Sequence, residues 1–399
     1  MTQRSPVPRL RDYRGPAILS YGFRPFFLLG AVYAGLAILV WLPVFLGELT
    51  LSTAFVPRDW HVHEMLYGYL PAVITGFLFT AIPSWTGRLP VQGRPLLVLV
   101  VVWLLGRFAV TCSAWIGWLA AMLIDASFLA LIAAATGREV FAGRNWRNLK
   151  VVVLVVLLLI GNIAFHLEAH VSGTADYGIR VGIAVVVLLI MLIGGRIIPS
   201  FTRNWLVREN PGRLPSPFGK PDVAIVILSA AALLVWIVRQ EGGFPGIALA
   251  VAGVLNLIRL CRWAGDRTVK ERLVLILHVG YAFIPAGFLL ASAAAFDLVP
   301  ASAAIHAWMA GGAGVMTLAV MTRASLGHTG QQLTALWPTQ GIYLAIIIAA
   351  LARIAAVIIP VWSGVLLDLA ALAWVIAFFG FAVFYGPLLM RPRAGAHRD

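Results

Sequence analysis

Trp60-His61-Val62-His63-Glu64-Met65 opens an apolar stretch that continues to Pro83. The stretch is long enough to cross the hydrocarbon core of a bilayer as one helix. Two imidazoles and a carboxylate are costly inside such a span, so they usually face a protein interior and serve a function. Imidazole is also the commonest metal ligand of proteins and suits iron and copper. The stretch therefore predicts a transmembrane helix that contributes to a redox-metal site.

The composition requires lipid as the main solvent. Of 399 residues, 61% are hydrophobic and only 12% are charged, and a soluble protein of this size could not hide so much apolar surface. The net charge of +14 is spread over short loops between apolar stretches, so it indicates orientation in a membrane rather than nucleic-acid binding. Two cysteines exclude a disulfide framework and a cysteine-rich metal site.

Twelve apolar stretches have spanning length, and we expect an all-α polytopic membrane protein with a single membrane domain over residues 1–399. Most Lys and Arg residues lie in the two tails and in the loops after the even-numbered spans, which by the positive-inside rule places both termini in the cytoplasm. The expected spans are 25–47, 58–82, 94–111, 115–136, 148–168, 178–199, 222–239, 244–263, 272–294, 300–323, 339–361 and 364–388.

A weak internal repeat links the second, sixth and tenth spans. The second span ends in Ile82-Pro83-Ser84-Trp85-Thr86, and the sixth repeats this pattern 116 residues later as Ile198-Pro199-Ser200-Phe201-Thr202. The tenth span aligns with the second at a distance of 243 residues, which pairs His63 with His306. Because the three spans are four apart, the pattern predicts a pseudo-threefold arrangement of three four-helix units, rather than the two six-helix halves of many transporters. Generic helix-end chemistry is the alternative.

His61 and His63 are two residues apart and therefore point about 200° away from each other on a regular helix. They cannot easily chelate one ion together, but they can serve two centres, or one can bind metal while the other bonds to protein. Glu64 is a candidate proton relay; it could instead accept a hydrogen bond from a metal-binding histidine or favour the helix N-terminus electrostatically.

Histidines of other spans are further candidate metal ligands, and each has an alternative role. Asn162 and His166 share one helix face, so His166 is a ligand or a surface residue. His278 is a ligand or makes an interhelical hydrogen bond, and His328 is a ligand or a residue of the loop after the tenth span. His306 is a ligand among glycines that suit either close helix packing or a flat macrocycle.

Basic residues recur where spans are expected to end on the cytoplasmic side. Arg88, Arg196 and Arg323 either extend toward lipid headgroups or pair with haem propionates. Arg353 and Asp368, on consecutive spans, are candidates for an ion pair.

Several motifs resemble the NnrS family along nearly the whole chain. They are Gly22-Phe23-Arg24-Pro25-Phe26-Phe27, the segment Trp60–Met65 quoted above, Gly76-Phe77-Leu78, Trp85-Thr86-Gly87, Gly195-Arg196-Ile197-Ile198-Pro199, Leu277-His278-Val279-Gly280 and Met321-Thr322-Arg323-Ala324-Ser325-Leu326-Gly327-His328-Thr329-Gly330. The resemblance implies a bacterial inner-membrane protein that contains haem b and copper and is linked to nitric oxide metabolism, nitrosative stress and denitrification. It gives most weight to His61, His63, His278, His306 and His328.

The predicted three-by-four arrangement is shared with the catalytic subunits of haem–copper oxidases and respiratory nitric oxide reductases. Here the sixth span has no histidine and the adjacent copper-binding histidine pair of the oxidases is absent, so we expect a rearranged metal site.

Three functions remain open at this point. The first is a haem–copper protein that binds nitric oxide and reduces or detoxifies it, with electrons from quinol or a periplasmic donor. The second is a haem-based protein that senses or sequesters nitric oxide, or protects other metal centres, without turnover. The third is a twelve-span transporter of metal, haem or a small solute. Membrane lipid is an expected partner and nucleic acid is not.

Overall fold

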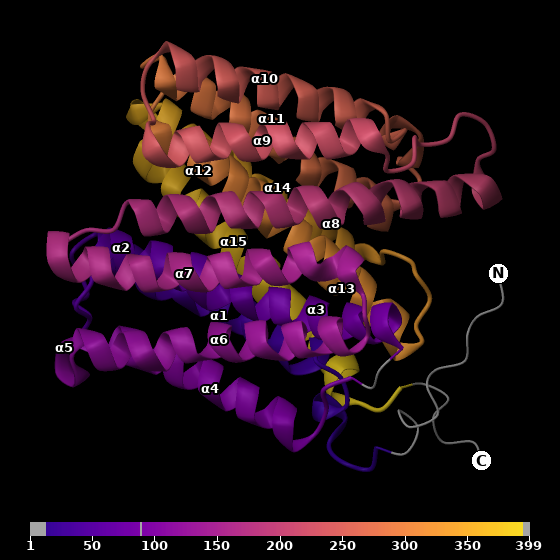
Figure 1. Ribbon diagram of the computed structural model, residues 1–399, viewed down its shortest axis with the longest axis horizontal. Helices are drawn as coiled ribbons and strands as arrows, with labels where there is room; N and C mark the ends of the chain where they lie inside the picture. The colour runs from indigo at the N-terminus through magenta and orange to yellow at the C-terminus, as the bar shows by residue number, and fades with distance from the viewer. Residues whose placement is uncertain (1–12, 88–89, 394–399) are drawn as a thin grey trace. The chain divides into compact units, whose positions relative to one another are not determined.

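The computed structural model describes residues 13–87 and 90–393, and this part of the chain is helical throughout, without a strand (Figure 1). Twelve helices are long and apolar enough to cross a membrane, as the sequence predicts. They are α1 (Phe23–Phe45), α2–η3–α3 (Pro57–His63, Glu64–Tyr69 and Leu70–Thr86), α4 (Arg94–Thr111), α6 (Trp118–Ala142), α7 (Leu149–Ser172), α8 (Tyr177–Glu209), α9 (Lys220–Val238), α10 (Gly243–Cys261), α11 (Arg272–Ala295), α12–η6–α13 (Ala301–His306, Ala307–Val315 and Met316–Thr329), α14 (Trp337–Ile358) and α15 (Ser363–Met390). A short helical turn, η2 (Ala17–Leu19), precedes the first span, and others connect some of the spans: α5 (Ser113–Ile116), η4 (Trp146–Asn148), η5 (Gly265–Thr268) and η7 (Pro360–Trp362).

Three spans continue at least six residues beyond the ends that hydropathy predicts, and one of them is α6, which runs to Ala142 rather than 136. Helix α8 runs to Glu209 rather than 199, because no helix-breaking residue follows Pro199 before Pro211 and Gly212. The tenth span runs to Thr329 rather than 323, and Gly330 ends it with a φ of 80°. His328 therefore lies in the last turn of a helix, and its expected position in a loop was wrong.

Two spans change from α-helix to π-helix at equivalent positions. Segment η3 begins directly after His63, and segment η6 begins directly after His306. These two starts are 243 residues apart, the same distance at which the sequences of the two spans align. The π-helices therefore support the alignment of the second span with the tenth, and π-helical turns frequently mark functional sites.

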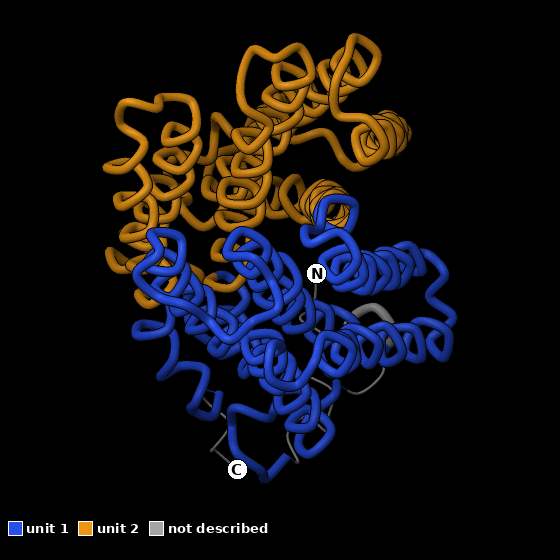
Figure 2. Tube along the Cα trace, turned by 90° about the vertical axis from the view of Figure 1, so that its left-hand side faces the viewer, with its two compact units in different colours: residues 1–179, 323–332, 381–399 blue, residues 180–322, 333–380 orange. Residues whose placement is uncertain are grey.

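The chain divides into two compact units, coloured separately in Figure 2. Unit 1 comprises residues 1–179, 323–332 and 381–399, and unit 2 comprises residues 180–322 and 333–380. Spans one to five lie in unit 1, where α4 packs on α6, α6 packs on α7 and α1 packs on α3. In unit 2, α11 packs on α10, on α12 and on η6. The single membrane domain and the three-by-four arrangement stay predictions.

The Gly22–Phe27 motif has a packing role in unit 1. Arg24 is buried and donates to the carbonyl oxygens of Leu389, at 2.9 Å, and Arg391, at 2.6 Å, at the end of α15. These carbonyls have no partner within a helix that ends there, so the guanidinium caps the last span. Gly22 lies so close to Phe79 that a Cβ atom at residue 22 would come within 2.5 Å of the Phe79 side chain. The motif thus fixes the start of the first span.

Unit 2 contains a fully buried polar group around Arg259, which we call the unit 2 cluster. The guanidinium donates to Asp222 Oδ1 at 2.8 Å, to the Tyr281 hydroxyl at 2.9 Å and to the Met191 carbonyl at 3.1 Å. Asn256 accepts from Tyr281 and donates to Ser229, both at 2.9 Å. The cluster holds α9, α10 and α11 together.

The ion pair expected between Arg353 and Asp368 does not form among the described residues. Both residues lie in unit 2, where Arg353 is partly buried and Asp368 is exposed. Similar depth on consecutive spans therefore does not specify which helix faces carry the two side chains.

Candidate metal centre

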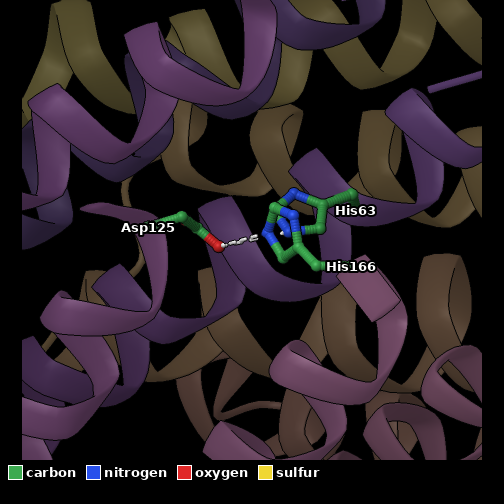
Figure 3. Close-up of side chains that lie close together, drawn as sticks. All are labelled: His63, Asp125 and His166. Carbon is green, nitrogen blue, oxygen red and sulfur yellow. Dashed lines mark hydrogen bonds and ion pairs between the residues drawn. The ribbon is translucent and has the colours of Figure 1, made fainter. Parts of the chain in front are cut away.

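Three side chains from three spans of unit 1 converge in the buried interior: His63 on α2, Asp125 on α6 and His166 on α7 (Figure 3). Each offers one ligand atom, and these atoms all lie within 4.8 Å of one another. Asp125 Oδ2 is 3.2 Å from Nε2 of His63 and 3.2 Å from Nε2 of His166. Two imidazoles and a carboxylate are a common donor set for transition metals.

His61 and His63 point to different surroundings, as their helical spacing predicts. The ring of His61 stacks on Trp41 at a centroid distance of 4.2 Å, whereas the ring of His63 is fully buried beside Asp125 and His166. Of the two, only His63 belongs to the convergent group.

An arginine joins the two carboxylates beside these histidines. Arg107 Nη1 donates to both oxygens of Glu64, at 2.8 and 2.9 Å, and Nη2 donates to Asp125 Oδ1. Tyr33 donates its hydroxyl proton to Glu64 Oε2. Glu64 Oε1 in turn lies 3.0 Å from Nδ1 of His63. This contact matches the alternative in which Glu64 accepts a hydrogen bond from a ligating histidine, because metal-binding histidines usually donate their second ring N–H to a carboxylate or carbonyl.

A glycine in the π-helix makes room for the arginine. At Gly68, a Cβ atom would come within 2.3 Å of Arg107 Nη1, so a larger residue there would require the guanidinium to move. The Gly68 carbonyl receives the indole N–H of Trp103 at 2.9 Å, which satisfies a backbone group in the altered turn. Glycine at this position therefore lets the guanidinium reach the carboxylates.

Oxygen atoms surround both ring nitrogens of His63. Nδ1 faces Glu64, and Nε2 lies 3.0 Å from Asn162 Oδ1 as well as 3.2 Å from Asp125. The Asn162 amide nitrogen donates to Asp125 Oδ2 at 2.7 Å, which fixes the amide so that its oxygen is the atom beside His63. Oxygens on both sides require either protons on both nitrogens or a cation beside Nε2.

The spacing of the donor atoms fits a small metal ion. Two ligands about 2.0–2.1 Å from one tetrahedral ion are about 3.3 Å apart, close to the two separations of 3.2 Å around Asp125 Oδ2. The ring centroids of Phe55 and Phe165 lie 5.3 and 5.1 Å from that of His63, and the ring centroid of Phe55 lies 5.2 Å from that of His166. These aromatic rings shield the group and lower the local dielectric, which strengthens electrostatic interactions within it.

The remaining candidate histidines have separate surroundings. In unit 2, His306 places Nδ1 2.6 Å from the Ser302 carbonyl, so Nδ1 carries a proton and donates it to that oxygen. His278 Nε2 lies 2.8 Å from the Thr202 hydroxyl, and a Cβ at Gly265 would lie 2.6 Å from Nδ1. This arrangement favours an interhelical hydrogen bond for His278.

His328, in unit 1, packs its ring against Tyr21 and Phe23, with centroid distances of 5.7 and 5.5 Å. The glycines after His306 serve helix packing: Cβ atoms at residues 311, 312 and 314 would contact Phe283, Ile284 and Trp374.

Two of the three candidate propionate partners lie among the described residues. Arg88 lies outside the described residues. Arg196, in unit 2, lies over the Phe218 ring at 5.6 Å, and Arg323, in unit 1, lies in α13 and is half-buried.

Sequence reasoning missed the carboxylate of the centre. Asp125 and Arg107 are ionisable residues within spans, which is a signal of a functional site. The sequence does not show, however, which residues they contact. Asn162 and His166, one turn apart, did indicate a shared face, and both contact Asp125.

Fold and site together define the class: a multi-pass helical membrane protein with a buried histidine–carboxylate centre suited to a metal ion. More specifically, the chain belongs to the NnrS family, because the family profile described as "NnrS protein" matches residues 17–393. No curated protein matches the chain.

Proposed function

We propose that the protein is a membrane metalloprotein of the nitric oxide response that holds copper at His63, Asp125 and His166 and haem b elsewhere, and that it binds and reduces nitric oxide. The observation that carries the proposal is the convergence of three ligand atoms from three spans in a water-shielded interior. Copper bound there would supply a one-electron redox centre and a coordination position for a diatomic ligand.

The protein's own residues support such a centre in three ways. Glu64 orients His63 through Nδ1, and Asn162 orients Asp125, so that the ligand atoms are held before a metal arrives. Arg107 bonds to both carboxylates and fixes their positions. The aromatic rings exclude water from the site. Preorganisation of this kind is what distinguishes a functional metal site from a chance cluster.

His306 is the better-prepared haem ligand of the candidates in unit 2. Its hydrogen bond to the Ser302 carbonyl fixes the tautomer in the way that ligating histidines require. We place the protein in a bacterial inner membrane with both termini in the cytoplasm, with quinol or a periplasmic protein as the electron donor. Glu64 is the candidate proton relay.

A transporter is the second candidate, and the division into two units is the observation that bears on it. Transporter sites typically lie where structural repeats meet. The histidine–carboxylate centre instead lies within unit 1, which favours a fixed metal centre.

Metal and haem analysis of the purified full-length protein tests the proposal. We expect one copper per chain, a Soret absorption band and consumption of nitric oxide in the presence of a reductant. His63→Ala, His166→Ala and Asp125→Asn should each lose that copper at normal expression. His170→Ala is the matched control, because His170 is exposed and stacks on Trp118 at 4.0 Å, away from the centre.

Each contrary result would contradict a specific part of the proposed function. Full copper occupancy in all three variants would contradict the assignment of the copper site to His63, Asp125 and His166. Bound haem and copper without consumption of nitric oxide favours sensing or sequestration, and absence of both favours transport.

A further inference from the structure

The net charge of the histidine–carboxylate centre in unit 1 indicates the charge of the ion that it binds. The carboxylates of Glu64 and Asp125 carry two negative charges, and the Arg107 guanidinium that joins them carries one positive charge. Tyr33 and Asn162 add no charge, and an imidazole that binds a metal ion is neutral. The site without a ligand therefore has a formal charge of −1.

A buried site is stable only when its net charge is near zero, because an uncompensated charge in a low-dielectric interior is strongly disfavoured. His63, Glu64 and Asp125 are at most 2% exposed, and Arg107 is 5% exposed, so water does not compensate this charge. One positive charge makes the site neutral. A divalent ion would leave it at +1.

The arrangement of His63 agrees with a positive charge at this position. Both its ring nitrogens face oxygen atoms, of Glu64 on one side and of Asn162 and Asp125 on the other. A metal-binding imidazole is neutral and donates its second ring N–H, here to Glu64, so the oxygens beside Nε2 would face the bound cation.

We infer that the centre is selective for a monovalent ion, so that copper is held in the cuprous state, and that Arg107 sets this selectivity. The inference rests on the proposed function as a copper site. The ligands themselves do not account for it, because imidazole and carboxylate also suit divalent copper and zinc. The guanidinium of Arg107 accounts for the selectivity, because it repels a divalent ion twice as strongly as a monovalent ion at the same place.

Anaerobic metal titration of the full-length protein in nanodiscs tests the role of Arg107. Silver(I) serves as the monovalent probe and zinc(II) as the divalent probe, and binding that persists in a His63→Ala/His166→Ala double variant is subtracted. Arg107→Gln should raise the ratio of zinc to silver affinity by at least about tenfold. Glu64→Gln, a change of one charge in the other direction, should lower the ratio by a similar factor. Arg107→Lys keeps the charge and should stay within about threefold of the wild type.

A purely structural role for Arg107 predicts something different. Both glutamine variants would then weaken the binding of silver and of zinc by the same factor and leave the ratio of the two affinities unchanged. That result would overturn the inference. A shift of the ratio in the same direction in both variants would overturn it too.

The reduction potential of bound copper gives a second measurement. It should fall in Arg107→Gln and rise in Glu64→Gln, because the first change favours the cupric ion and the second disfavours it. If neither variant folds, the wild type alone decides: one copper per chain should remain silent in electron paramagnetic resonance after exposure to air. A full cupric signal would contradict the inference while leaving the copper site intact, whereas absence of copper would contradict the proposed function itself.

Discussion

The two units each contain a buried cluster centred on an arginine, and the clusters use similar parts. In unit 1, Arg107 joins two carboxylates, with an asparagine and a tyrosine beside them. In unit 2, Arg259 pairs with one aspartate and contacts a tyrosine that is bonded to an asparagine. The first cluster includes His63 and His166, whereas the contacts of the second include no imidazole among the described residues.

The charge balance of the clusters also differs. Asp222 pairs with Arg259 and, at 3.7 Å, with the partly exposed Arg262, so the unit 2 cluster has no excess negative charge and needs no further cation. The unit 1 cluster has a second carboxylate and needs one more positive charge. A buried polar network alone therefore indicates stability, and excess negative charge together with imidazole ligands indicates a metal site.

The largest difference should follow removal of the aspartates. Asp222→Ala leaves Arg259 buried without the carboxylate that it pairs with, so the free energy of unfolding should fall by about 3–5 kcal/mol. Asp125→Ala leaves Arg107 bound to Glu64 and should lower it by about 1–3 kcal/mol. Thermal unfolding in detergent measures both effects, and metal analysis should show a loss of copper in Asp125→Ala alone. Equal destabilisation with equal loss of metal would contradict the distinction between the clusters.

Two glycines give a closer test, since each makes room for one of the guanidinium groups. A Cβ at Gly195 would lie 1.9 Å from Arg259 Nη2, and one at Gly68 would lie 2.3 Å from Arg107 Nη1. Each Gly→Ala change should lower the free energy of unfolding by about 1–3 kcal/mol through overpacking. Only Gly68→Ala should also change metal binding, with a higher ratio of zinc to silver affinity, because it displaces Arg107 from both carboxylates.

Gly341→Ala is the matched control for these two substitutions. Residue 341 lies in α14, and a Cβ there would meet nothing within 4 Å, so alanine should be neutral or slightly stabilising. A destabilisation of Gly341→Ala as large as that of Gly195→Ala would show that close contact with arginine is not the cause.

Sequence patterns predicted the helices well and the pairing of side chains poorly. Hydropathy located all twelve spans because the length and polarity of a span are local properties. The ends of α8 and α13 were misplaced because a helix can continue as polar chain beyond the apolar stretch until glycine or proline stops it. The π-helices were not foreseen, although the repeat relating His63 to His306 marks both of their starts.

The candidate metal centre shows the same limit, because the sequence predicted relations within one helix but not contacts between helices. Helical spacing predicted that His61 and His63 diverge and that Asn162 and His166 share a face, because both statements concern one helix. That Asp125 meets His63 and His166 depends on the packing of three helices, which no local pattern specifies. For the same reason the expected pair of Arg353 and Asp368 was wrong.

The tyrosines of the two clusters should give smaller effects. Tyr33→Phe removes one hydrogen bond to Glu64 and should lower the free energy of unfolding by about 0.5–1.5 kcal/mol. Tyr281→Phe removes bonds to Arg259 and Asn256 and should lower it by about 1–3 kcal/mol. Copper affinity should decrease in Tyr33→Phe only, by about tenfold, since Glu64 orients a ligand. An equal decrease in Tyr281→Phe would contradict the assignment of unit 2 to stability.

The smallest effect should come from an exposed ion pair, which tests how far burial explains the other differences. Arg213 donates to both carboxylate oxygens of Asp266 at 2.6 Å, and this hydrogen bonding holds the pKa of Asp266 below its ordinary value. A lowered pKa means that the pair stabilises the folded state above the unfolded-state pKa, about 3.9, and that this contribution is lost as the pH falls through the folded-state value. Both side chains are more than half exposed, so solvent limits the contribution to less than about 1 kcal/mol. Thermal unfolding of Asp266→Asn should therefore show a small loss at pH 7 that disappears in acid, and a loss at pH 7 as large as that of Asp222→Ala would mean that burial is not what makes the ion pair of Arg259 strong.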